Sequence, residues 1–147
     1  MKSNPFVFTA LTPDDEEYLM ALRAAMIVAL ERSGSYGIPL PPTVDALVFL
    51  QGRWDEGVFD PSDPNDVDAV AVVLGDVLAA QLGLHWTMVS GPYGTYPTLR
   101  YRQTSIQVTA LQMIAKRVDE GRDVNLTELY EGVRHQVSDM VNSGNYK

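Results

Sequence analysis

The chain of 147 residues contains few of the histidine and cysteine side chains that most often serve as general bases, nucleophiles or metal ligands. Its histidines are His85 and His135, and it has no cysteine, which excludes a disulfide scaffold, a thiolate metal site and a cysteine nucleophile. Glycine-rich phosphate loops, the G-x-S-x-G elbow and the H-E-x-x-H zinc motif are absent from the sequence. A zinc site would need both histidines and carboxylates from elsewhere in the chain. The sequence therefore predicts no catalytic residue, no metal site and no cofactor.

His85 falls in a predicted strand, and His135 falls in a predicted helix beside Arg134. A strand histidine is more often a structural residue with a satisfied ring than a ligand or a general base, and we expect His135 at the surface. The alternative for His85 is a pocket between the sheet and the third helix, completed by a nearby carboxylate such as Asp76. That arrangement would make the chain a small-ligand-binding protein or an enzyme.

The segment from Asp55 to Asp68 contains six acidic residues and no basic residue. Such a loop invites comparison with a calcium site, because hard cations bind several oxygens from one turn. The spacing does not fit that interpretation. Counted from Asp63, position 5 is Val67, and Leu74 stands where a calcium loop has its bidentate glutamate. We therefore expect a solvated loop whose acidic side chains cap helices.

The formal net charge of −8 comes from 19 acidic and 11 basic side chains. Residues 1–68 contain 12 acids and 4 bases, whereas residues 69–147 contain 7 of each, so the whole excess lies in the first half. An acidic protein repels nucleic acids and anionic membrane surfaces, which excludes a general binder of either kind. Charge complementarity instead favours a basic protein partner for the acidic half.

Tyrosine and arginine, which are enriched at the hot spots of interfaces, concentrate in one short region. Tyr93 and Tyr96 belong to a predicted turn, and Arg100 and Arg102 alternate along the following strand with an inward-facing Tyr101. We predict that Tyr93, Tyr96, Arg100 and Arg102 form a partner-binding surface. The alternative is that the arginine stems cover apolar sheet surface and that the tyrosines pack against the prolines of the loop.

Two amphipathic helices are predicted in the first 57 residues of the chain. The first predicted helix begins at Thr12, with a proline and several acids in its first turn, and ends at residues 33–34. The second begins at a Thr43 cap and ends near Gly57. Both have apolar residues at three- and four-residue steps, which is typical of amphipathic helices.

The third predicted helix has the clearest periodicity in the chain. Asp63 or Asn65 can cap its start, an apolar stripe runs from Val67 to Leu82, and Gly83 supplies a left-handed stop. Gly75 lies within the stripe, where glycine costs about 1 kcal/mol relative to alanine. Such a glycine indicates that another backbone passes close to the helix.

After this helix the pattern changes to short strands. We predict strands over residues 84–89 and 98–102, joined by a turn at 90–94, and a short third strand at 105–108. Two amphipathic helices follow, one with its apolar positions in 111–118 and one with its apolar positions in 126–140. Residues 1–8 are too weakly apolar for a signal peptide, and no run reaches the ~20 apolar residues that cross a bilayer, so we expect a soluble cytoplasmic protein.

Two sequence patterns resemble a known family. The run L-G-x-x-L-x-x-x-L-G-L-x-W occupies Leu74 to Trp86, and K-R-x-x-x-G follows at Lys116 to Gly121. Together with the P-T-L-R-Y segment at 97–101, they are similar to the bacterial domain-of-unknown-function family 3806 over about residues 62–141. The resemblance implies a small bacterial protein of mixed helix–strand–helix architecture. It implies no activity and no catalytic residue.

These observations predict a single α+β domain over residues 1–147, with a helical N-terminal extension (1–60) before a family-like core (62–141). We expect two N-terminal helices, a long third helix, a small antiparallel sheet of two or three strands, and two C-terminal helices packed on the sheet. The predicted function is that of a non-enzymatic protein-binding module of the bacterial cytoplasm, of the immunity or antitoxin type. A homodimer formed through the exposed edge of the sheet is compatible with this prediction.

Overall fold

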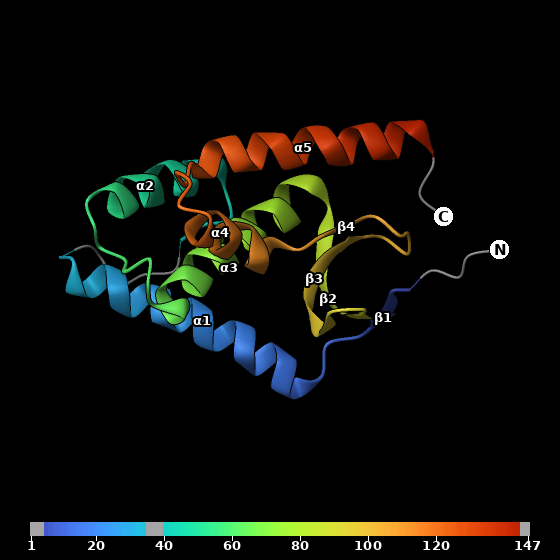
Figure 1. Cartoon of the computed structure of the whole chain (residues 1–147), viewed down its shortest axis with the longest axis horizontal. Helices are drawn as coiled ribbons and strands as arrows, with labels where there is room; N and C mark the ends of the chain where they lie inside the picture. Colours follow the sequence, from blue (N-terminus) through green and yellow to red (C-terminus); the bar gives the residue numbers. More distant parts are fainter. Residues whose placement is uncertain (1–4, 35–39, 145–147) are drawn as a thin grey trace.

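A computed structural model describes residues 5–34 and 40–144 of the chain. Over those residues the protein has five helices and one four-stranded antiparallel sheet (Figure 1). The elements are β1 (Val7–Thr9), α1 (Pro13–Arg32), α2 (Val44–Asp55), α3 (Pro64–Leu82), β2 (Leu84–Gly91), β3 (Gly94–Tyr101), β4 (Gln107–Val108), α4 (Ala110–Asp119) and α5 (Leu126–Ser143). The α+β class and the five helices are confirmed. The predicted count of two or three strands is wrong, because β1 adds a fourth.

The predicted helix caps account for where α1 and α3 begin and end. The Thr12 hydroxyl accepts a hydrogen bond from the backbone N–H of Asp15, whose carboxylate accepts one from the Thr12 N–H in return. Of the two candidates for the α3 cap, Asp63 is the one that performs it, because it accepts from the Asn65 N–H at 2.9 Å. Gly83 ends α3 in the left-handed conformation, with φ of 68°.

Helix α3 is the centre of the molecule, and the other helices and the sheet pack around it (Figure 1). Val70, Leu74 and Leu78 are completely buried along it. The sequence pattern predicted a single apolar stripe, but neighbours on several sides bury most of the helix circumference, which is typical of a core helix. The C-terminal helices were both expected on the sheet. Helix α4 does contact β3, whereas α5 packs mainly against α2 and α3.

The strand that the sequence did not predict, β1, pairs antiparallel with β2 and places Phe8 opposite Val89. Three residues are too few to display the alternation that identifies a strand. The extended conformation of β1 comes from the hydrogen-bonded ladder with β2, which lies far along the chain. The sheet order is β1-β2-β3-β4, so the short strands β1 and β4 form its two edges. Pairing of two copies through such an edge stays a prediction.

Strands β2 and β3 form a longer hairpin than predicted. Leu84 is opposite Tyr101 and Gly91 is opposite Gly94, which leaves Pro92 and Tyr93 as a two-residue turn. Alternation along these strands sends Trp86 and Leu99 to the face that packs on the helices. The opposite face carries His85, Phe8 and Arg100, so the two faces have different chemistry.

None of the helices in residues 5–34 and 40–144 combines the length and the hydropathy needed to cross a membrane. The signal-peptide prediction depends in part on residues 1–4, which lie outside the described residues.

Candidate functional site

A cleft of about 700 Å³ opens between the start of α1, the start of α3, the β2–β3 hairpin and α4. Four carboxylates line it, namely those of Asp15, Asp68, Asp119 and Glu120, and we call it the acidic cleft. Lys116 is the one basic side chain among the described residues that line it. The cleft therefore attracts positive charge.

Apolar and aromatic side chains form the rest of the acidic cleft. Met88 and Leu111 contribute almost fully buried side chains, and Pro97 lies opposite Met88 in the hairpin register. Tyr18 and Tyr96 also line the cleft. Tyrosine has an apolar ring and a polar tip, so the cleft offers contacts for the stem of a long side chain as well as for its charge.

Asp68 and Tyr18 form a coupled polar pair in this cleft. Burial raises the pKa of Asp68, although the hydrogen bond from the Tyr18 hydroxyl acts in the opposite direction. Burial and the neighbouring Asp68 carboxylate together raise the pKa of Tyr18. A partly desolvated carboxylate gains stabilisation from a cation that enters the cleft. The sequence pattern places Asp68 among the acids of the loop and gives no signal for Tyr18, which is one of several apolar or aromatic positions on α1.

The acidic loop from Asp55 to Asp68 otherwise uses its side chains in local hydrogen bonds. The Asp60 carboxylate accepts from both the N–H and the hydroxyl of Ser62, and these bonds lower the pKa of Asp60. The carboxylate of Asp66 accepts from the Asp60 N–H, and Asp63 caps α3. In the described parts of the chain no three metal-ligating side chains come together. The loop is shorter than predicted, because Asp55 belongs to α2 and Asp66 and Asp68 belong to α3, and the turn between them ends at the Asp63 cap.

A second, smaller hollow of about 410 Å³ lies against the sheet near β1 and the start of α1. Its polar lining includes Glu16, His85, Arg100 and Gln103, and Phe8 supplies an aromatic wall. We call it the sheet pocket. The guanidinium of Arg100 lies over the Phe8 ring, 4.0 Å from the ring centroid, and its Nε–H donates to the Thr104 carbonyl at 2.7 Å. A hollow therefore lies beside His85, but on the face of the sheet that points away from α3, so the predicted pocket between the sheet and the third helix is wrong in its location.

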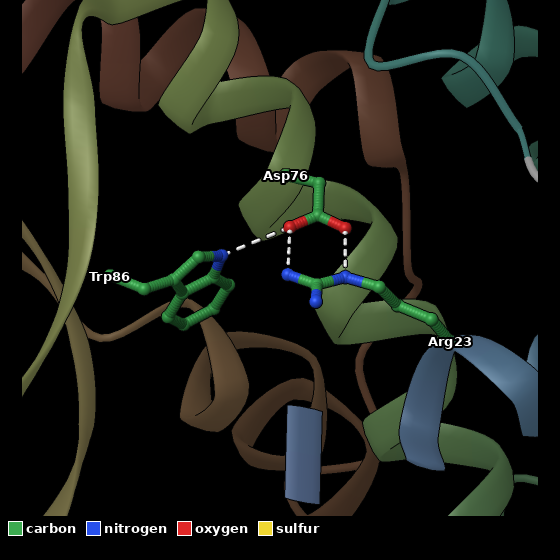
Figure 2. A network of polar contacts seen from close by, with 3 residues as sticks. All are labelled: Arg23, Asp76 and Trp86. Atoms are coloured by element: carbon green, nitrogen blue, oxygen red, sulfur yellow. Dashed lines mark hydrogen bonds and ion pairs between the residues drawn. The ribbon is translucent and has the colours of Figure 1, made fainter. Parts of the chain in front are cut away.

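The carboxylate expected beside His85 is elsewhere. Figure 2 shows Asp76 on α3 between the indole of Trp86 and the guanidinium of Arg23. Its Oδ1 accepts from Trp86 Nε1 and from Arg23 Nη2, both at 2.9 Å, and its Oδ2 accepts from Arg23 Nε at 2.8 Å. Since Trp86 and His85 are successive residues of a strand, they point to opposite faces. Asp76 consequently belongs to a structural bridge between α1, α3 and β2.

Gly75 explains why the indole of Trp86 can reach Asp76. A Cβ atom added at Gly75 would lie 2.4 Å from Cζ2 of that ring. The prediction of a close approach at Gly75 is correct, but the neighbour is an aromatic side chain rather than a backbone. The glycine gives the ring a place against α3.

Comparison with known families identifies the central part of this fold. The family described as "Domain of unknown function (DUF3806)" matches residues 46–130, which is more than half of the chain. The chain belongs to the DUF3806 family. The matched segment begins within α2 and ends within α5, so it starts and stops earlier than the 62–141 suggested by the resemblance. A search of curated proteins finds no match.

A solved structure from Bacteroides thetaiotaomicron VPI-5482, determined at 1.50 Å resolution, has a similar fold, with a TM-score of 0.74. The two proteins are 14% identical, so the likeness concerns the fold alone. The alignment covers 88% of this chain and 47% of the other, which means that this chain spans about half the length of that structure.

Both hollows combine the DUF3806 segment with residues that precede it. In the acidic cleft, Asp68 and Asp119 lie within the matched segment, whereas Asp15 lies before it. In the sheet pocket, Arg100 lies within the segment and Glu16 lies before it. The start of α1 thus lines two hollows together with the family domain.

The structure distributes the four predicted contact residues along the whole of β3. Tyr93 is 91% exposed in the hairpin turn, and Tyr96 lines the acidic cleft. Arg100 lines the sheet pocket, whereas Arg102 follows the strand in a left-handed conformation, with φ of 49° and its guanidinium near the Tyr101 ring. At about 3.3 Å per residue, Tyr93 and Arg102 are roughly 30 Å apart. Tyr96 and Arg100 are therefore parts of two different hollows.

Proposed function

We propose that the chain is a non-enzymatic protein-binding module that takes a basic segment of a partner protein into the acidic cleft. The observation that carries the proposal is the lining of this cleft, where four carboxylates and one lysine surround an apolar floor. A segment with an arginine or lysine next to an apolar side chain complements both features. The same charges would speed up the encounter with a basic partner at low ionic strength.

A module of the immunity or antitoxin type in the bacterial cytoplasm fits this chemistry, because such a protein acts by covering a surface of its partner. Asp15 and Asp68 of the acidic first half would then act together with Asp119 and Glu120 at the end of α4. In this proposal the partner contributes a basic patch, and salt weakens the complex. Tyr96 would contact the partner inside the cleft, and Tyr93 would contact it at the exposed hairpin turn.

An enzyme built on His85 and Asp76 has less support. The side chain of Asp76 already accepts three hydrogen bonds from Arg23 and Trp86. A general base must reach the proton that it removes, and this half-buried carboxylate is occupied by Arg23 and Trp86. A small-ligand site beside His85 needs no such base and is a separate proposal.

The test uses two synthetic 12-residue peptides with the same leucine and tyrosine content, one carrying four arginines and the other four glutamates. Binding to the full chain is measured by fluorescence anisotropy at low and at high salt. We expect the arginine peptide to bind with an affinity that falls as salt rises, and the glutamate peptide not to bind. Absence of binding by both peptides would contradict the proposal.

A matched pair of double variants separates the cleft from bulk charge attraction. The first variant combines Asp119→Asn and Glu120→Gln, which removes two charges from the cleft. The second combines Glu31→Gln and Asp139→Asn, which removes two exposed charges elsewhere. Each exposed charge contributes up to about 1 kcal/mol, so the first variant should weaken binding of the arginine peptide by roughly tenfold. An equal loss in the second variant would show attraction to the net charge alone.

A further inference from the structure

We propose that the sheet pocket is a second binding site, which receives a carboxylate group of a ligand on the guanidinium of Arg100. Its volume of about 410 Å³ lies within the range of small-ligand pockets. It shares no lining residue with the acidic cleft. Carboxylates dominate the lining of the cleft, whereas the proposed ligand contact in the sheet pocket is the positive charge of Arg100. The proposal therefore goes beyond the binding of a basic partner.

Arg100 is held in the orientation that a carboxylate requires. Its Nε–H is bonded to the Thr104 carbonyl, and the Phe8 ring supports the plane of the guanidinium. Within residues 5–34 and 40–144, its terminal nitrogens have no hydrogen-bond acceptor or carboxylate partner. Those two nitrogens form the fork that binds a carboxylate through two parallel hydrogen bonds. Because protein contacts already fix the side chain, little rotamer freedom remains to be lost on binding.

His85 and Gln103 supply further donors to the same pocket. His85 is exposed and lies directly opposite Arg100 in the β2–β3 register. Gln103 is also exposed and lines the pocket from the turn that follows β3. An imidazole N–H and an amide N–H are suited to the oxygen atoms of a carboxylate. The pocket thus has donors from two strands and a turn around one aromatic wall.

Glu16 is the one carboxylate among the described residues that line the pocket. It opposes an anionic ligand, and it gives the proposal a directional test. If the ligand contributes only a carboxylate, neutralising Glu16 should strengthen binding. The carboxylate can come from a small free acid or from the C-terminus of a peptide, and the same guanidinium would bind either.

The experiment is an NMR titration of the full, isotope-labelled chain at constant ionic strength. The probes are acetate, N-acetyl-Gly-Gly, and N-acetyl-Gly-Gly amide, which lacks the carboxylate. We expect saturable shifts of the Arg100 Nε–H and of the Gln103 side-chain amide with a carboxylate probe and none with the amide. Saturation by acetate indicates a free acid, and saturation by the peptide alone indicates a C-terminus. Shifts that grow linearly and match those produced by chloride would overturn the proposal.

Three variants test the roles of the individual residues. Arg100→Gln should weaken binding by about tenfold or more, as expected when a charged hydrogen-bond donor is lost. Arg102→Gln makes the same change of charge outside the pocket and should stay within about twofold. Glu16→Gln should tighten binding by roughly twofold or more. An equal loss in the two arginine variants, or weaker binding in Glu16→Gln, would overturn the proposal.

A folding defect in Arg100→Gln is distinguished by Arg100→Lys, which keeps the charge and the stem but not the fork. We expect it to retain the fold, as judged by its amide spectrum, and to bind more weakly than the natural chain. The Asp119→Asn, Glu120→Gln variant should leave the pocket shifts unchanged. The two proposals can therefore fail independently. The NMR shifts with carboxylate probes test the sheet pocket, and binding of the arginine peptide tests the acidic cleft.

Discussion

The acidic cleft and the sheet pocket share the first turn of α1 but use neighbouring residues of it, Asp15 in the cleft and Glu16 in the pocket. Successive side chains of a helix diverge by about 100°, so one turn can supply two separate hollows. In the cleft, charge accumulates from four carboxylates on helices or at their ends. In the pocket, the sheet holds one arginine by an aromatic ring and a carbonyl. The acidic cleft attracts cations because it gathers four carboxylates. The sheet pocket is suited to an anion because one side chain, Arg100, is held in place.

The largest expected effect comes from a change that damages both hollows. Gly75→Ala would force the Trp86 ring away from α3, because the new Cβ would lie 2.4 Å from it. Overpacking of this kind should lower the free energy of unfolding by about 2–3 kcal/mol, measured by urea denaturation.

The control for this variant is Gly52→Ala in α2, where an added Cβ meets nothing within 4 Å. A helical glycine replaced by alanine in open space should raise the free energy of unfolding by roughly 0.5–1 kcal/mol. Equal effects at the two positions would contradict the role given to the Trp86 contact.

A smaller loss of unfolding free energy is expected when the bridge between Arg23, Asp76 and Trp86 is broken (Figure 2). Asp76→Ala leaves Trp86 Nε1 and the Arg23 guanidinium without their acceptor, which should cost about 1–2 kcal/mol in a urea titration. Because this bridge ties α1 to α3 and β2, we expect weaker binding at both hollows. Asp139→Ala on the exposed side of α5 should change the free energy of unfolding by less than about 0.5 kcal/mol. Loss of binding at only one hollow would show that the bridge does not position α1 for both.

The smallest effect should belong to the cleft alone. Burial raises the pKa of Asp68 in the folded chain, so folding favours its protonated form. The resulting contribution to stability is greatest below the unfolded pKa and is lost as pH rises through the folded pKa. Asp68→Asn removes this dependence and should be slightly more stable than the natural chain near pH 7, by less than about 1 kcal/mol for a partly exposed group.

Urea titrations of both chains between about pH 3 and pH 7 measure this difference, which should shrink toward low pH. Binding of acetate in the sheet pocket should not change in Asp68→Asn. A stability difference that grows as pH falls would contradict the assignment.

Local signals were sufficient to predict most helices. The Thr12 cap and the Gly83 stop act within a few residues of themselves, so their structural consequences are visible in the sequence. The same is true of Asp60 and Asp63, whose carboxylates bond within their own turn or cap the next helix. The predicted orientation of β3, with Tyr101 inward and Arg100 outward, also follows from alternation alone and agrees with the register.

Contacts between distant segments decided the features that the sequence did not predict. The strand β1 exists through its pairing with β2, and Gly75 faces an indole because β2 returns along α3. Tyr18 became a site residue only when the start of α3 brought Asp68 to it. The spacing of residues along the sequence does not predict which distant segments come into contact.

The sequence by itself determined the α+β class, the main helix ends, the DUF3806 resemblance and the excess of acid in the first half. The tertiary structure alone decided that Asp15 and Asp68 meet the carboxylates at the end of α4 in one cleft, and that Arg100 meets Phe8 in another hollow. It also decided that Asp76 bonds Trp86 and lies away from His85. The physical reason is that caps, stops and periodicity depend on neighbours in sequence, whereas a binding site depends on which faces of separate elements pack together.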